Sequence, residues 1–338
     1  MATHRDLRRA GSPAEVAAAL ADHGYLADHA LATVVHLALA MRRPLLLEGE
    51  PGVGKTEVAR TVAAATGGEL IRLQCHEGID VGQAVYEWDF SRQILHLRAA
   101  EAAAGIAEHH GEHGTVEADP AQLEDALFTE RYLVARPLLR AIHHEAEIPP
   151  VLLVDEVDRA DDEFEAFLLE ALSDYSVTVP ELGTFTATEP PVVVLTSNRT
   201  RDVHDALRRR CLYHWVEHPD LEREVRIVTT RAPQVPVELA RQVATVSQRF
   251  RELGLYKPPG VAETIDWAVA ISTLGIDTLD VDVLRATMGT VLKYREDQDR
   301  VGAMGLAALV GTLGSRTGPE TGPQTGLQGG TVPGGDAG

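Results

Sequence analysis

A glycine-rich stretch near the start of the chain has the residue types and spacing of a loop that binds phosphate groups. GEPGVGKT fits the pattern Gly-x-x-x-x-Gly-Lys-Thr. In such a loop, consecutive backbone N–H groups converge on phosphates at a helix N-terminus, where the helix dipole favours anions. The lysine reaches the β and γ phosphates of a nucleotide, and the threonine hydroxyl ligates Mg²⁺. The loop residues are Gly49, Glu50, Pro51, Gly52, Val53, Gly54, Lys55 and Thr56.

The loop could instead be an ordinary strand-to-helix turn that merely contains a lysine. The sequence on either side of the loop helps to decide between these two interpretations. Residues 44–47 form a short apolar run typical of a buried strand, and residues 57–67 have a helical pattern that ends at a glycine. The order strand, loop, helix is the setting that the phosphate-binding motif requires. We therefore predict that the loop binds the phosphates of a nucleotide.

Two acidic residues follow a second apolar strand, in the run VLLVDE. We expect the end of this strand to hold Asp155 near Mg²⁺ and to place Glu156 where it polarises a water molecule toward the γ-phosphate. The alternative is that the two acids only mark the end of a buried strand before an exposed helix. With a phosphate-binding loop upstream, we favour the site that hydrolyses the nucleotide.

Polar residues after a third apolar strand, and a basic cluster beyond it, could complete such a site. Asn198 ends the run VVVLTSN and could orient the same water, although asparagine is also common in turns. Downstream, the segment DALRRRCLYHW carries Arg208, Arg209 and Arg210. An arginine that reaches the γ-phosphate of a neighbouring subunit accelerates hydrolysis by about 10³- to 10⁵-fold. The alternative is a solvated basic helix end.

Two weaker patterns have ordinary structural explanations. His109, His110 and His113 could hold a metal, but they have no cysteine or well-spaced carboxylate beside them, and a polar loop explains them better. The aromatic residues of QAVYEWDF, which are Tyr86, Trp88 and Phe90, alternate as in a strand with one aromatic face. This face either packs in the core or forms an exposed loop that grips a client protein.

Strand and helix patterns alternate through the first two thirds of the chain, which predicts an α/β fold with a mostly parallel, doubly wound sheet. Ser12-Pro13 is a typical helix start. We expect helices at 13–22, 27–42, 57–67 and 163–174, strands at 44–47, 69–74, 151–154 and 190–198, and a hairpin at 175–188. Four helical patterns follow, near 221–232, 236–253, 261–274 and 279–295. The predicted domains are N-terminal helices with a nucleotide-binding αβα core at 1–219, an all-helical lid at 220–313 and a disordered tail rich in Gly, Pro and Thr at 314–338.

Composition narrows the classes of molecule that the protein could bind and the cellular compartment in which we expect it. The chain has 51 acidic and 31 basic side chains, a formal net charge of −20, which repels a phosphate backbone and makes nucleic acid an unfavoured partner. Cys75 and Cys211 form no disulfide framework or metal-ligand spacing, which favours a reducing compartment, and we expect a cytoplasmic protein. The longest apolar run is too short to span a bilayer, so we expect no membrane insertion.

Taken together, the motifs resemble those of AAA+ ATPases, and among them the MoxR-like group, closest to the CoxD-type members associated with carbon monoxide dehydrogenase maturation. The resemblance covers about residues 20–310. GEPGVGKT resembles the Walker A motif, VLLVDE the Walker B motif and LTSN the sensor 1 motif. Less generic stretches, LIRLQCHEGIDVGQAVYEWDF, RYLVARPLLRAI and ALRRRCLYHWVEHP, resemble CoxD-type relatives. In the register of the family, RCLYHW points to Arg210 before Arg209 as the arginine finger.

The resemblance implies ATP and Mg²⁺ as cofactors and a hexameric ring with nucleotide at the subunit interfaces. It also implies that the ring works with a von Willebrand A domain protein to remodel or activate a metalloenzyme. The family's insertions at its second helix and before sensor 1 correspond to the Tyr86 to Phe90 region and the 175–188 hairpin, and we expect one or both of these to touch the client. One departure is that KPPGVAETIDW lacks the sensor 2 arginine at the start of a lid helix, and Lys257 is a possible substitute.

Three other functions fit parts of the sequence. A nucleic-acid motor of the AAA+ class would share the motifs, although the net charge argues against it. A nucleotide-gated adaptor with negligible hydrolysis would be compatible with the missing sensor 2 arginine. GTP could replace ATP, because the motifs that hold phosphates do not read the base.

Overall fold

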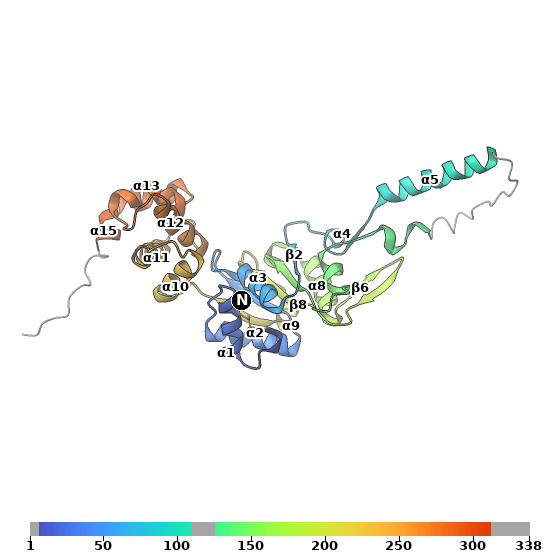
Figure 1. Ribbon diagram of the computed structural model, residues 1–338, viewed down its shortest axis with the longest axis horizontal. Helices are drawn as coiled ribbons and strands as arrows, with labels where there is room; N and C mark the ends of the chain where they lie inside the picture. The colour runs from blue at the N-terminus through green and yellow to red at the C-terminus, as the bar shows by residue number, and fades with distance from the viewer. Residues whose placement is uncertain (1–6, 110–125, 312–338) are drawn as a thin grey trace, which may run out of the picture.

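The centre of the computed structural model, which describes residues 7–109 and 126–311, is a five-stranded parallel sheet (Figure 1). The strand order is β2-β5-β8-β1-β9, and every neighbouring pair is parallel. The carboxyl ends of all five strands therefore lie at one edge of the sheet. The strands are β1 (Leu45–Gly49), β2 (Leu70–Gln74), β5 (Val151–Asp155), β8 (Val192–Ser197) and β9 (Leu212–Val216). The predicted α/β fold with a mostly parallel sheet is confirmed.

The apolar runs of the central strands explain why both faces of the sheet are covered. Successive side chains of a strand point to opposite faces, and β1 and β5 are buried along their whole length. Leu45 and Leu47 pack with the first three helices, whereas Leu46 packs with helices of the opposite face. Covering the first face are α1 (Pro13–Asp22), α2 (His29–Met41) and α3 (Lys55–Thr66); covering the second are α7 (Pro137–Ile142) and α8 (Asp162–Asp174).

Local sequence signals start several of these helices. Ser12 caps α1, its side chain accepting a hydrogen bond from the Glu15 N–H, and Pro13 is the first helical residue, as the sequence predicts. Asp28 and Asp161 cap α2 and α8 in the same way. The short helix α9 (Asp205–Arg210) precedes β9, and 3₁₀ turns occur at η1 (Leu7–Arg9), η2 (Glu130–Tyr132) and η3 (Val157–Arg159).

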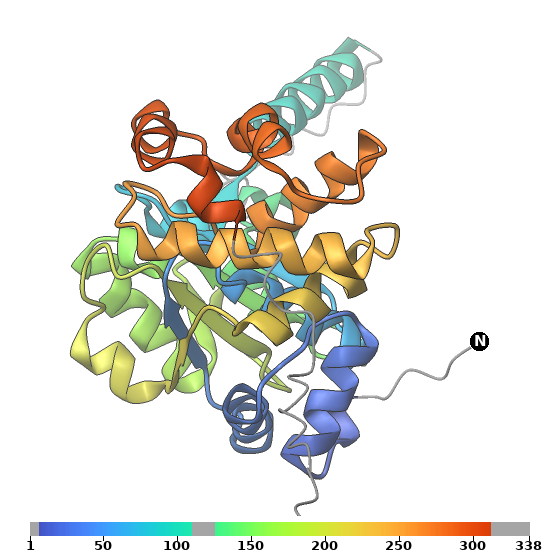
Figure 2. The same ribbon diagram turned by 90° about the vertical axis from the view of Figure 1, so that its left-hand side faces the viewer.

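The helices after the sheet pack around a hydrophobic core of their own, which includes Phe250, Trp267 and Leu284. We call this helical part the lid; it lies at one end of the long axis in Figure 1 and in front of the sheet in Figure 2. The lid helices are α10 (Leu221–Arg231), α11 (Val237–Glu252), α12 (Val261–Thr273), α13 (Val281–Val291), α14 (Arg295–Ala303) and α15 (Leu306–Val310). The helix predicted at 279–295 is too long: it ends at Val291, because Leu292 adopts extended backbone angles.

Two elaborations extend from the other end of the core. In the first, α4 (Val81–Ala84) leads to β3 (Tyr86–Trp88), which pairs antiparallel with β4 (Leu133–Ala135), and α5 (Phe90–His109) projects away from the sheet (Figure 1). The second is the predicted hairpin, formed by β6 (Ser176–Val179) and β7 (Gly183–Thr186).

The predicted aromatic strand is only partly right. It stops at Trp88, because the Asp89 carboxylate accepts the N–H of Arg92 and so begins α5. Trp88 is buried, whereas Phe90 is 60% exposed. Trp88 therefore packs in the core, and Phe90 does not.

Several expectations concern residues near or beyond the limits of the description. His109 is the last residue of α5 rather than part of a loop, whereas His110, His113 and the predicted disordered tail at 314–338 lie outside the described residues. Within residues 7–109 and 126–311, no helix combines the length and the apolar character needed to cross a membrane.

Candidate active site

The predicted phosphate loop connects the carboxyl end of β1 to the first turn of α3. Gly52 and Gly54 adopt φ values of 82° and 96°, a region that favours glycine. Gly54 is the N-cap of α3 and offers no side chain to the free N–H groups of the first turn. These groups and the helix dipole together suit a bound anion. The structure thus provides the strand, loop and helix that the motif requires.

Lys55 is folded back under the loop. Its Nζ donates hydrogen bonds to the carbonyl oxygens of Gly49, at 2.7 Å, and Glu50, at 2.8 Å, and the residue is 6% exposed. Burial lowers the pKa of this amine from 10.5 to about 8, although nearby carboxylates, Asp158 and Asp155 foremost, favour the charged form. Bound phosphates would add negative charge beside the amine and stabilise its cation.

The two residues predicted to hold Mg²⁺ lie side by side. The Thr56 hydroxyl donates a hydrogen bond to Asp155 Oδ1 at 3.1 Å, and the Thr196 hydroxyl donates to the same oxygen at 2.5 Å. The Asp155 side chain is 4% exposed, at the end of β5. A hydroxyl and a carboxylate next to a phosphate loop form the oxygen-rich donor set that Mg²⁺ takes, so these residues fit the ion.

Glu156 and Asn198, predicted to act on one water molecule, are also brought together. Glu156 has a left-handed backbone, with φ of 56°, directly after the buried strand. Asn198 Nδ2 lies 3.4 Å from Glu156 Oε1, and Gln74 Nε2 donates to Glu156 Oε2 at 3.1 Å. The backbone N–H of Asn198 is in turn held by the buried Asp158 carboxylate at 3.2 Å. A carboxylate and an amide therefore face the same space at the carboxyl edge of the sheet.

The structure places Arg209 and Arg210 at the opposite edge. They end α9, just before β9, which runs parallel to β1 with Leu212 beside Leu45. The length of β1 therefore separates them from the loop, about 13 Å at about 3.3 Å per residue. Both side chains are exposed. Neither arginine is brought to the phosphate loop of its own chain.

The C-terminal turn of α9 is held by an arginine from another element. The Arg43 guanidinium donates to the carbonyl oxygens of Arg209 at 2.9 Å and Arg210 at 2.8 Å. The Arg210 guanidinium itself donates to the carbonyl oxygen of Ser173 at 2.5 Å. Both contacts fix the direction in which this turn faces.

Sequence reasoning missed Arg72, Gln74, Arg43 and Thr196, all of which contact predicted site residues. Arg72 and Gln74 are the polar positions of the strand LIRLQ, which ends beside Asp155. Two polar residues on one face of a strand were the available signal, although only the pairing of β2 with β5 gives them their partners.

A pocket beside the loop connects it to the lid. The backbone N–H of Val261, the first residue of α12, donates to the Gly52 carbonyl at 2.9 Å. Lys257, the possible sensor 2 substitute, is exposed and does not line this pocket. Its lining comes from the α1–α2 connection, the loop and the lid, and includes Tyr25, Leu26, Gly52, Val53, Gly54, Arg223, Ile227, Arg231, Val261 and Ile265.

The lid arginines at this pocket come from α10 instead of α12. Arg231 pairs with Glu57 at 2.7 Å, and Arg223 pairs with Asp28 at 2.9 Å. Burial raises the pKa of the neighbouring Tyr25 hydroxyl to about 12, so this hydroxyl stays protonated at neutral pH. Apolar side chains with a few fixed polar groups are typical of a pocket that takes a small molecule.

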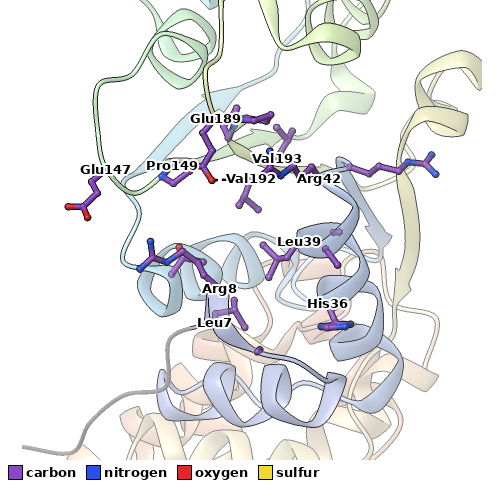
Figure 3. Close-up of a pocket in the computed structure, with 17 residues that line it drawn as sticks. Leu7, Arg8, His36, Leu39, Arg42, Glu147, Pro149, Glu189, Val192 and Val193 are labelled. Carbon is purple, nitrogen blue, oxygen red and sulfur yellow. Dashed lines mark ion pairs between the residues drawn. The ribbon is translucent and has the colours of Figure 1, made fainter.

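A second cavity, of about 370 Å³, lies at the other edge of the sheet (Figure 3). It is bounded by the start of β8, at Val192 and Val193, and by residues of η1 and α2. An ion pair between Arg42 and Glu189, 3.9 Å apart, lies at its rim. The predicted site residues do not line it. The predicted site residues other than Arg209 and Arg210 therefore lie at the carboxyl edge.

The candidate site lies within a stretch of the chain that matches a known protein family. Residues 44–211 match the family model of the AAA domain of the dynein-related subfamily. No curated protein compared with the chain matches it. Among solved structures, the Thermotoga maritima RuvB Holliday junction branch migration motor is 16% identical, with 91% of this chain and 86% of that chain covered and a TM-score of 0.42. An alanine-to-serine mutant of the same RuvB is 17% identical, with the same coverage and a TM-score of 0.46. The matched residues, 44–211, contain every predicted site residue, and the protein is an ATPase of the AAA+ fold that uses ATP and Mg²⁺.

Proposed function

We propose that this ATPase is a MoxR-like ring, closest to the CoxD type, whose active sites form between subunits. The observation that carries the proposal is the position of Arg209 and Arg210, exposed at the edge of the sheet opposite the phosphate loop. An arginine there serves hydrolysis only in a neighbouring copy. Arg210 is the preferred arginine finger, with Arg209 second. Arg210 precedes the last strand, and its backbone carbonyl accepts a hydrogen bond from Arg43, which helps to orient it.

The roles of the other site residues follow from their contacts. Lys55 and the loop N–H groups bind the phosphates, while Thr56 and Asp155 hold Mg²⁺, which neutralises charge on the phosphates when bound. Glu156 accepts the proton of the attacking water, and Asn198, 3.4 Å from the Glu156 carboxylate, orients that water. We assign nucleotide binding to residues 1–219 and the lid to residues 220–313.

We further propose that the ring remodels or activates a metalloenzyme client together with a von Willebrand A domain protein. Support comes from the exposed apolar side chains of the first elaboration. Phe90, Ile94 and Leu95 on α5 are 60%, 53% and 68% exposed, and Val134 of β4, which pairs with Glu87 of β3, is also exposed. Such a group of apolar side chains on a projecting element is typical of a protein-binding surface.

Complementation between two inactive variants tests the shared active site. Lys55→Ala loses its own nucleotide site but keeps its arginine finger, whereas Arg210→Ala has the opposite defect. Each alone should hydrolyse ATP slowly, and an equimolar mixture should regain part of the wild-type rate, because some interfaces combine the two intact halves. Wild-type activity per subunit should also rise with protein concentration. Arg295→Ala, which changes an exposed lid arginine, is the matched control.

Two results would contradict a shared active site with hydrolysis. If Arg210→Ala and Arg209→Ala both hydrolyse ATP at the wild-type rate, neither residue is the finger. If the wild-type rate is near zero at all concentrations, the protein is better described as a nucleotide-gated adaptor. The absence of an arginine at the start of α12 is the observation that favours this second function.

The client surface has its own test. Phe90→Ser with Ile94→Ser should leave the ATPase rate unchanged and abolish co-purification with the von Willebrand A domain protein or the metalloenzyme. Co-purification that persists after removal of both the α4–β4 elaboration and the β6–β7 hairpin would contradict the assignment.

A further inference from the structure

The carboxylate of Asp155 has every acceptor position filled by donors of its own chain. A carboxylate offers about four lone-pair sites. Oδ1 accepts hydrogen bonds from the hydroxyls of Thr56 and Thr196. Oδ2 accepts two from Arg72, with Nε at 3.0 Å and Nη2 at 2.5 Å. A further cation or a metal-bound water can reach this carboxylate only when one of these donors leaves.

Of the three donor side chains, Arg72 is the one that can leave Asp155 with the smallest loss of free energy. Its side chain is 45% exposed, whereas that of Asp155 is 4% exposed, so the guanidinium can be hydrated when it withdraws and the carboxylate cannot. Thr196 lies inside the sheet and is 1% exposed, and Thr56 is itself a predicted metal ligand. The charge of Arg72 also balances the buried carboxylate, which without a partner would destabilise the fold.

We propose that Arg72 is a resident counter-cation of Asp155, which must leave Oδ2 before the site takes up Mg²⁺ with nucleotide, and which thereby weakens the apparent affinity for Mg²⁺. Two cations compete for one carboxylate, because the guanidinium and the ion both need the same oxygen or its immediate surroundings. In the absence of nucleotide, Arg72 keeps the buried charge paired. In its presence, the ion takes over that role.

The same arginine is linked to the catalytic carboxylate through one side chain. Arg72 Nη2 also donates to Gln74 Oε1, and Gln74 Nε2 donates to Glu156 Oε2 at 3.1 Å. Withdrawal of Arg72 from Asp155 therefore changes the partner that orients the Gln74 amide. Uptake of the ion at Asp155 is in this way coupled to the position of Glu156.

Thermal unfolding and Mg²⁺ titration of Arg72→Met test the proposal. Without nucleotide and with a chelator present, the variant should unfold at a lower temperature than the wild type, because Asp155 loses its counter-charge. With saturating Mg²⁺ and ADP, the difference should disappear or reverse. In a titration of Mg²⁺ at fixed concentration of a fluorescent ADP analogue, the midpoint should fall by about three- to tenfold. Arg140→Met, which breaks an exposed ion pair with Glu69 near the start of β2, should show neither effect.

Two further variants keep the test decisive. Arg72→Lys retains the charge without the paired N–H groups and should give an intermediate midpoint, so it replaces Arg72→Met if that variant does not fold. In an Asp155→Asn background, Arg72→Met should no longer lower the unfolding temperature, because the charge that Arg72 balances is gone. Equal destabilisation with and without Mg²⁺ and ADP, together with an unchanged midpoint, would make Arg72 a structural residue only. A weaker affinity for Mg²⁺ and ADP in Arg72→Met would also overturn the proposal.

Discussion

Replacing Lys55 by methionine should stabilise the nucleotide-free protein at pH 7, although it abolishes nucleotide binding. The folded protein keeps this amine at 6% exposure, where the charged form is disfavoured. The pKa falls from 10.5 to about 8, which corresponds to about 3 kcal/mol of unfavourable free energy while the amine is charged. Loss of the hydrogen bonds to Gly49 and Glu50 offsets about 1 kcal/mol each. We therefore expect Lys55→Met to be about 1 kcal/mol more stable than the wild type.

The difference should reverse with pH. Below pH 8 the Lys55 amine is charged in both the folded and the unfolded chain, and the folded protein carries the full penalty. Between pH 8 and 10.5 the folded chain has lost this proton while the unfolded chain still binds it, so wild-type stability rises relative to the variant. At pH 10 most of the free-energy cost of burying the charged amine is gone. The loss of two hydrogen bonds is then the main difference between the variant and the wild type. Lys55→Met should then be about 1 to 2 kcal/mol less stable.

Urea unfolding at pH 7 and pH 10 measures both differences. A Trp267→Phe background removes the tryptophan of the lid, so that fluorescence of Trp88 and Trp215 reports the part of the fold that contains the loop. Lys257→Met, at an exposed lysine of the lid, is the matched control and should change stability little at either pH. A Lys55→Met variant that is less stable than the wild type at pH 7, or whose difference does not depend on pH, would refute the reasoning.

Three other substitutions test the remaining parts of the site. Glu156→Gln should bind a fluorescent ATP analogue normally and turn over at least about 100-fold more slowly, and turnover equal to the wild type would remove Glu156 as the base. Asn198→Ala should slow steady-state hydrolysis about 10- to 100-fold with unchanged ADP affinity, whereas a matching loss of affinity would point to a binding role. Gly260→Ala should weaken ATP binding about tenfold, because its Cβ would lie 2.5 Å from the Gly52 Cα; Gly302→Ala, which meets nothing within 4 Å, is the control, and equal affinities would show that the lid contact does not matter.

The sequence identifies those parts of the site that are close together along the chain. The loop from Gly49 to Thr56 was predictable, because the phosphate-binding pattern lies between a strand and a helix that each have their own local signal. The same holds for Asp155 and Glu156, since acids after a buried strand must emerge at its carboxyl end. A parallel sheet puts Asn198 at the same edge as these acids, and the pairing of β5 with β8 then brings it to Glu156.

The features that the sequence did not reveal depend on pairing between distant elements. Nothing local indicates that β2 lies beside β5, and without that neighbour Arg72 is an ordinary polar residue of a strand. The clamp of Arg43 on the end of α9 joins residues 166 and 167 positions apart. The helix α14 was missed because REDQDRVGA has only one large apolar residue, Val301, which is buried in the lid core. The helix is also held by Asp297, whose carboxylate accepts the backbone N–H groups of Tyr256 and Lys257.

The contact between Gly52 and the start of α12 also limits how such a protein can diverge. Each Cβ added at Gly52 or Gly260 would meet the Cα of the other residue, at 2.7 and 2.5 Å. Backbone atoms, joined by the hydrogen bond from Val261 to Gly52, thus fasten the lid to the nucleotide loop. This backbone contact does not depend on the side chains that α12 carries along the rest of its length. A lineage could therefore lose a charged residue from this helix and still inherit a lid that moves with the loop, provided that both glycines were kept.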